Sequence, residues 1–165
     1  MFAIFPLLLA MAATPPPPSA VLESPTRHIR TTNAYVSSLL KDGFYRSPTF
    51  ARLVTRLERS DLIVYIELLE RMPSGIEGRM MMMPRTHDHR YVRIQIEMQG
   101  SNADGVALLG HELQHARELA DAPSVTDMAG FVALFERIGK KSGAREYETV
   151  AATETALQVR HELLM

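Results

Sequence analysis

The chain of 165 residues contains no cysteine. This absence excludes a cysteine nucleophile, disulfide bonds, zinc sites built from thiolates and a lipid anchor on cysteine, although it leaves the cellular compartment open. The chain also lacks an excess of either charge, because 18 Lys and Arg nearly balance 19 Asp and Glu to give a net charge of −1. We therefore expect neither nucleic acid nor an anionic membrane surface as a partner.

The first twenty residues carry no charged side chain. Residues 2–13 form an apolar run that is shorter than the roughly 20 residues needed to span a bilayer, so stable membrane insertion is not expected. Small residues at the spacing of a signal-peptidase site stand at its end, in residues 10–13. We therefore predict a signal peptide over residues 1–20 and a secreted or periplasmic protein. Four consecutive prolines disfavour a buried helix and predict an extended proline-rich linker over residues 14–25.

Hydrophobic periodicity over the rest of the chain predicts both helices and strands. Apolar residues at helical spacing follow Ser47-Pro48, a capping residue with proline in the first helical position. Alternating apolar and polar residues over 91–98 predict a strand with one buried face. This order predicts one α+β domain over residues 26–165, in which a small antiparallel sheet of about three strands packs against helices. The expected elements are helices over residues 31–40 and 47–58, strands over 62–68, 79–83 and 91–98, and helices over 103–122, 124–139 and 144–164.

Histidine is scarce, with six in the chain, yet His111 and His115 flank Glu112 in the sequence H-E-x-x-H. On a central helix this spacing places both imidazoles on one face, about 40° apart, where both can bind one Zn²⁺ ion. Glu112 is then close enough to accept a proton from water activated by the metal. The neighbouring residues 106–110 are uncharged, so we expect the histidines to be partly buried and in need of a partner. The alternative is a pair of idle histidines on an exposed helix.

A catalytic zinc site needs a third protein ligand, and several carboxylates compete for this position. Asp121 stands six residues after the second histidine, but on a continuous helix it would point away from the pair. Glu118 shares a face with the first histidine and is expected either to act as an outer carboxylate or to be solvated. Glu148 and Glu154 fall within the apolar arc of the last predicted helix, where an unpaired carboxylate is costly. Glu148 is the preferred ligand because small residues follow it one turn later, and Glu154 is the alternative.

A helix with H-E-x-x-H, a strand before it and a glutamate on a later helix resemble the gluzincin branch of zinc metallopeptidases, over residues 62–164. Residues 108–116, LLGHELQHA, are also similar to small secreted bacterial proteins that carry this motif. The resemblance implies a minimal zincin-like domain with Zn²⁺ held by His111, His115 and Glu148. It further implies that Glu112 acts as the general base and passes its proton to the leaving amine. The implied substrate is a peptide or protein, whose backbone would pair with residues 91–98 if that strand lies at the sheet edge.

Two positions depart from the gluzincin pattern. Ala152 stands where many members have an aspartate that orients the first histidine, and Arg117 replaces an apolar residue. The alternative function is therefore a catalytically inactive, secreted zinc-binding module with the same fold. A di-iron carboxylate protein is disfavoured because Glu112-x-x-His115 has no second copy. Candidate donors to the oxyanion of a peptidase are Tyr147, Arg145, His161, His87 and His89.

Overall fold

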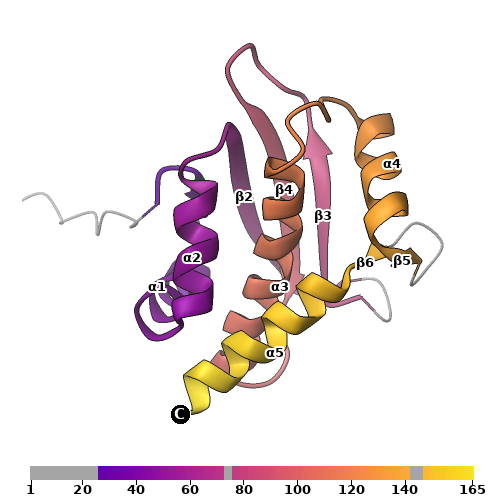
Figure 1. Cartoon of the computed structure of the whole chain (residues 1–165). Helices are drawn as coiled ribbons and strands as arrows, with labels where there is room; N and C mark the ends of the chain where they lie inside the picture. Colours follow the sequence, from indigo (N-terminus) through magenta and orange to yellow (C-terminus); the bar gives the residue numbers. More distant parts are fainter. Residues whose placement is uncertain (1–25, 73–75, 142–146) are drawn as a thin grey trace, which may run out of the picture.

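The computed structural model describes residues 26–72, 76–141 and 147–165 (Figure 1). The predicted signal peptide and linker lie outside these residues. Helices and a mixed sheet in one chain confirm the predicted α+β class. In chain order the elements are β1 (Ile29–Arg30), α1 (Ala34–Arg46), α2 (Pro48–Leu57), β2 (Leu62–Leu69), β3 (Gly78–Met83), β4 (Arg90–Glu97), α3 (Asn102–Ala120), α4 (Met128–Ile138), β5 (Lys140–Lys141), β6 (Tyr147–Glu148) and α5 (Val150–Leu164).

The main sheet has four strands in the order β1-β2-β4-β3, and β5 pairs separately with β6. β1 and β4 both run parallel to β2, whereas β3 and β4 form an antiparallel hairpin. The predicted antiparallel pairing is therefore wrong outside this hairpin. After β2 the chain passes to the outer edge as β3 and returns as β4, so β4 enters the sheet in the direction of β2. β3 is consequently an edge strand and β4 is not, and the expected pairing of a substrate with residues 91–98 does not apply.

Helices α2, α3 and α5 lie on one face of the main sheet (Figure 1). On β4 the side chains of Tyr91, Arg93 and Glu97 are partly exposed on the other face. This alternation confirms the strand with one buried face that the sequence predicted, except at Gln95, which is buried and hydrogen-bonded to Arg79 and Glu67. The intervening apolar residues of β4, fully buried against the helices, are Val92, Ile94 and Ile96.

Helices α1 and α4, like α5 described below, begin later than predicted because of their capping residues. α1 begins three residues later, after Asn33, whose side chain accepts a hydrogen bond from a backbone amide of the first turn. α4 begins after Asp127, which accepts from the Gly130 amide, and not after Ser124 as predicted. Gly139 ends α4 as predicted. None of the helices in the described part of the chain is both long and apolar enough to cross a membrane.

The start of α2 is held by residues from two places in the sequence. Ser47 caps the helix by accepting from the Phe50 amide at 3.0 Å, and Pro48 occupies the first helical position, as predicted. Glu162, near the end of α5, accepts a hydrogen bond from the Ser47 hydroxyl. It also accepts from the Thr49 amide at 3.0 Å and from the Thr49 hydroxyl at 2.7 Å. Unpaired amides at a helix start favour such a carboxylate. The end of α5 is thereby fixed on α2.

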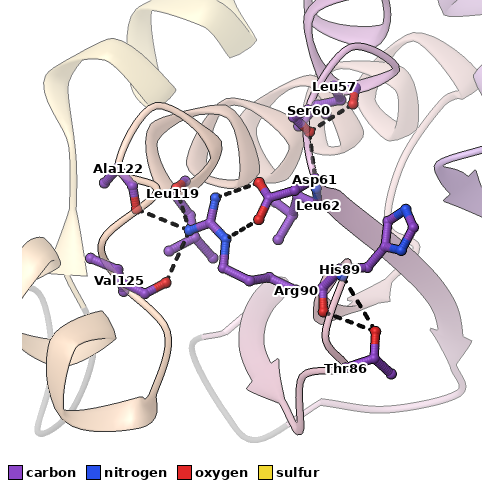
Figure 2. A network of polar contacts seen from close by, with 10 residues as sticks. All are labelled: Leu57, Ser60, Asp61, Leu62, Thr86, His89, Arg90, Leu119, Ala122 and Val125. Carbon is purple, nitrogen blue, oxygen red and sulfur yellow. Dashed lines mark hydrogen bonds and ion pairs between the residues drawn. The ribbon is translucent and has the colours of Figure 1, made fainter.

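Arg90, at the start of β4, holds the C-terminal end of α3 in place (Figure 2). Its guanidinium is buried and binds both carboxylate oxygens of Asp61, at 2.7 and 2.8 Å. Nη1 also donates to the carbonyl oxygens of Leu119, Ala122 and Val125, at 2.9 to 3.0 Å. These carbonyls lie at and just beyond the C-terminus of α3, where the helix itself supplies no donors. The position of α3, which carries the histidine pair, is therefore tied to the sheet.

Candidate metal centre

α3 presents His111 and His115 one turn apart on an unbroken helix. A capping box between Ser101 and Asp104 fixes its start, with Asp104 accepting from the Ser101 amide at 3.0 Å. The Nε2 atoms of the two histidines lie 3.2 Å apart. The prediction that both imidazoles share one helix face is therefore confirmed.

Glu148 lies beside both histidines. Its Oε2 atom is 2.9 Å from Nε2 of His111 and 3.9 Å from Nε2 of His115. The three candidate ligand atoms all lie within 4.8 Å of one another, and within the described residues no other set of three His, Cys, Asp or Glu meets this condition. The group can hold a metal ion.

The element that carries Glu148 differs from the prediction. Residues 147–148 form strand β6, and α5 begins only at Val150, after Thr149 as its N-cap. Glu148 is paired with Lys140 across the small sheet, and its side chain is 46% exposed. The expectation of a buried glutamate on a helix is therefore wrong, because the helix was assumed to begin before a strong capping residue.

Two of the other candidate carboxylates, Glu154 and Asp121, lie away from the histidine pair. Glu154 is exposed on α5 and does not belong to the metal-binding group, so its predicted burial is wrong. Asp121 points away from the histidines, as expected, and forms ion pairs with Arg56 and Arg117. Glu148 is thus the candidate that the fold brings to the histidine pair.

Glu118 contacts His115 at the ring nitrogen that does not face the candidate metal position. Its Oε2 lies 3.1 Å from Nδ1 of His115, and its Oε1 accepts a hydrogen bond of 2.7 Å from the Thr149 hydroxyl. Burial opposes ionisation of Glu118, but the hydrogen bonds from His115 and Thr149 outweigh it and lower the pKa of the carboxyl. A carboxylate on the outer nitrogen orients the ring and directs Nε2 toward the candidate metal position. The prediction of Glu118 as an outer carboxylate agrees with this geometry.

Glu112 is buried between α3 and the edge strand β3. Its carboxylate lies against Gly78, where an added Cβ atom would be 2.3 Å from Oε1. Burial raises the pKa of Glu112 to about 7, and the nearby His115 and His111 partly oppose this rise. A carboxyl with this pKa exchanges a proton close to neutral pH, as a general base requires.

The charges of the histidine pair and Glu148 are strongly coupled. Burial opposes protonation of His115, but hydrogen bonds to Glu118 and Glu148 outweigh it and raise the pKa of the imidazole to about 9. Hydrogen bonds from His111 and then His115 lower the pKa of Glu148 to about 2. Glu148 is therefore ionised at neutral pH, as a metal ligand must be.

Two hollows meet at this centre. A groove of about 750 Å³ runs past His111 and Glu148, with Leu108 and Leu157 among its apolar residues. A smaller recess of about 100 Å³ lies on the other side of the histidines. Its lining residues are Gly78, Arg79, Met80, Glu112, His115, Phe131, Phe135, Tyr147 and Glu148. The recess was not predictable from the sequence, because nothing in the helical pattern of α4 assigned Phe131 and Phe135 to the site.

The candidate oxyanion donors occupy different places. Tyr147 lines the recess, although its hydroxyl donates to Glu136 at 2.8 Å. His87 is exposed in the hairpin turn, where it contacts Asp88, and His89 packs against His28. His161 is exposed on α5, and Arg145 lies outside the described residues. Tyr147 is therefore the candidate from this set that borders the centre.

No protein-family model, curated protein or solved structure matches this chain. Function must therefore be inferred from the geometry and chemistry of the site.

Proposed function

We propose that the protein is a secreted zinc metallopeptidase, with His111, His115 and Glu148 as metal ligands and Glu112 as the general base. The observation that carries the proposal is the convergence of two Nε2 atoms and one carboxylate oxygen beside a buried glutamate. The resemblance of this motif to gluzincins supports the same assignment.

The donor set fits zinc better than it fits Mg²⁺ or Ca²⁺. Two imidazoles and one carboxylate, with a fourth position left open, are a known ligand set of catalytic zinc. Bonds of about 2.0–2.1 Å in a tetrahedron separate neighbouring ligand atoms by roughly 3.3 Å. The observed separations lie on either side of this value. Nε2 of His111 is 2.9 Å from Glu148 and 3.2 Å from Nε2 of His115, and Nε2 of His115 is 3.9 Å from Glu148. Mg²⁺ and Ca²⁺ prefer six or more oxygen ligands.

The chain's own residues have separable tasks in this proposal. When bound, zinc supplies Lewis-acid chemistry that activates water and polarises a carbonyl group. Glu112 takes a proton from the attacking water and returns it to the leaving amine, a role that suits its pKa of about 7. Glu118 keeps the ring of His115 in one orientation.

The edge strand β3 is the proposed binding site for the substrate backbone. It pairs with β4 on one side, so its other side can accept an extended peptide as an additional strand. Gly78 of this strand touches Glu112, so a peptide along β3 would pass beside the general base. The groove of about 750 Å³ offers room for residues on one side of the cleaved bond, and the recess of about 100 Å³ for a side chain on the other.

The alternative is a secreted module that binds zinc without catalysis. One observation favours it: Ala152, at the position of the aspartate of many gluzincins, is buried and offers no carboxylate to His111. Glu112→Gln distinguishes the two functions, because the amide keeps the size of the side chain and cannot act as a base.

In a metallopeptidase, Glu112→Gln lowers hydrolysis of a diverse peptide library by roughly 10²–10⁴-fold, while bound zinc is retained. Glu154→Gln, on the exposed face of α5, serves as the matched control and leaves hydrolysis unchanged. Equal cleavage by wild type and Glu112→Gln, or no cleavage by either, would favour the zinc-binding module.

A further inference from the structure

Thr149 occupies the junction between the candidate ligand Glu148 and helix α5. It is only 4% exposed, and its hydroxyl makes two hydrogen bonds in opposite senses. As the N-cap of α5 it accepts from the Ala152 amide at 3.1 Å, and as a donor it reaches Oε1 of Glu118 at 2.7 Å. The Thr149 carbonyl also accepts from the Thr153 amide at 3.2 Å. Backbone and side chain of Thr149 are thus fixed together.

A continuous series of contacts leads from this hydroxyl to the histidine pair. Glu118 receives the Thr149 hydrogen bond on one oxygen and contacts Nδ1 of His115 with the other, at 3.1 Å. Nε2 of His115 then faces His111 at 3.2 Å and Glu148 at 3.9 Å. Since Glu148 is the residue before Thr149, the series returns to its starting point. The position of the third ligand and the orientation of the second histidine therefore share one support.

We propose that Thr149 is a positioning residue of the metal centre, which holds Glu118 against His115 and sets Glu148 at the start of α5. The inference rests on the proposed metal site and deepens it. A helix cap alone requires only an acceptor. The contact with Glu118 requires a donor as well, and a hydroxyl supplies both. The metal centre and the start of α5 consequently form one cooperative unit.

The test is a double-mutant cycle on zinc affinity, measured by competition with a chromogenic chelator. Thr149→Val removes both hydrogen bonds at nearly constant volume and weakens zinc binding by roughly 10–100-fold, the usual cost of losing an outer partner. Thr149→Ser keeps the hydroxyl and stays within about threefold of wild type. In a Glu118→Ala background, Thr149→Val causes a smaller further loss, because the contribution through Glu118 is already gone and only the placement of Glu148 by the cap remains.

Asn33→Ala is the matched control for lost capping. It removes the side-chain acceptor at the start of α1, remote from the histidines, and leaves zinc affinity unchanged. An unchanged affinity in Thr149→Val, or an equal loss in both backgrounds, overturns the positioning role while the metal site stands. No zinc binding by wild type overturns the site itself.

Hydrogen exchange in the wild-type protein gives a test that needs no variant. Coupling between the metal and the start of α5 is reciprocal, so Zn²⁺ slows exchange of the Ala152 amide, which Thr149 caps. The Val36 amide, capped by Asn33, is the internal control and changes less. Equal changes at both amides contradict the coupling.

Discussion

The carboxylate of Glu112 lies directly against Gly78 of the sheet. The space that a Cβ atom would need at position 78 is filled by the glutamate carboxylate. Glycine is therefore required here because it lets the Glu112 carboxylate approach the strand backbone. The reason is not a left-handed conformation, since the backbone φ of Gly78 is not positive. One residue of the edge strand β3 thus sets where the proposed general base lies.

Gly78→Ala is expected to displace the Glu112 carboxylate, because the new Cβ would lie 2.3 Å from Oε1 and 2.9 Å from Cδ. Misplacement of a catalytic group by about 1 Å costs on the order of 10²-fold in rate, so peptide hydrolysis falls by about that factor. Zinc content stays the same because Glu112 is not a proposed ligand. Gly130→Ala on α4, where an added Cβ meets its nearest neighbour at 3.4 Å, is the control. Normal hydrolysis by Gly78→Ala would argue against Glu112 as the base.

At the scale of elements, the site depends on the contacts that hold the C-terminal ends of α3 and α5 in place. Arg90 fastens the end of α3 to the sheet, and Glu162 fastens the end of α5 to α2. Both contacts join segments that are distant in the sequence. The position of α5 matters most for the site, since the start of this helix follows Glu148 directly.

Glu162 gives the anchoring of α5 a dependence on pH. Burial opposes its ionisation, but hydrogen bonds from Ser47, Gln158 and Thr49 outweigh it and lower the pKa of the carboxyl to about 2. A carboxyl with a folded pKa below its unfolded value of 4.5 stabilises the fold above pH 4.5 and loses this contribution as pH falls toward 2. Solvent screening limits the contribution to about 1 kcal/mol.

Glu162→Gln should therefore lower the free energy of unfolding at pH 7 and have a smaller effect at pH 3. Urea denaturation at pH 7, 5 and 3 measures this difference, with Glu154→Gln on the same helix as the control. An equal loss of stability at all three pH values would show that the charge of Glu162 does not anchor α5.

At the scale of the whole molecule, local sequence signals predicted the elements better than their pairing. Ser47-Pro48 and the apolar spacing of α2 were sufficient for that helix, and alternation was sufficient for β4. The parallel pairing of β2 with β4 was not predictable, because it depends on the route of the chain through β3. The two-residue strand β1 is too short for a periodic signal.

In the candidate site too, relations within one helix were predictable from the sequence, whereas contacts that depend on the tertiary fold were not. H-E-x-x-H on a helix fixed the relation of His111, Glu112 and His115, because one helix turn determines it. The fold brings Glu148 to the histidine pair, but not for the predicted reason, since it lies exposed on β6 and not buried on a helix. The capping signal of Thr149 was present in the sequence but was read as part of a longer helix. Gly78 reaches Glu112 only through the tertiary fold.

Export is the part of the proposal that concerns residues outside the described structure. Cleavage between about residues 13 and 21 is expected, because small residues follow the apolar run there. Mass spectrometry of protein isolated from its natural source measures the mature N-terminus. An intact residue 1–20 segment in a cytoplasmic fraction would contradict secretion.

The zinc content of the chain, purified without chelator and measured by inductively coupled plasma mass spectrometry, tests the central claim most directly. The account predicts about one zinc per chain. It also predicts loss of the metal in His111→Ala and His115→Ala, and a higher melting temperature with zinc than without it, because the ion binds the folded state. A zinc content near zero that is not restored by added Zn²⁺, or a content unchanged in both histidine variants, would contradict the metal centre.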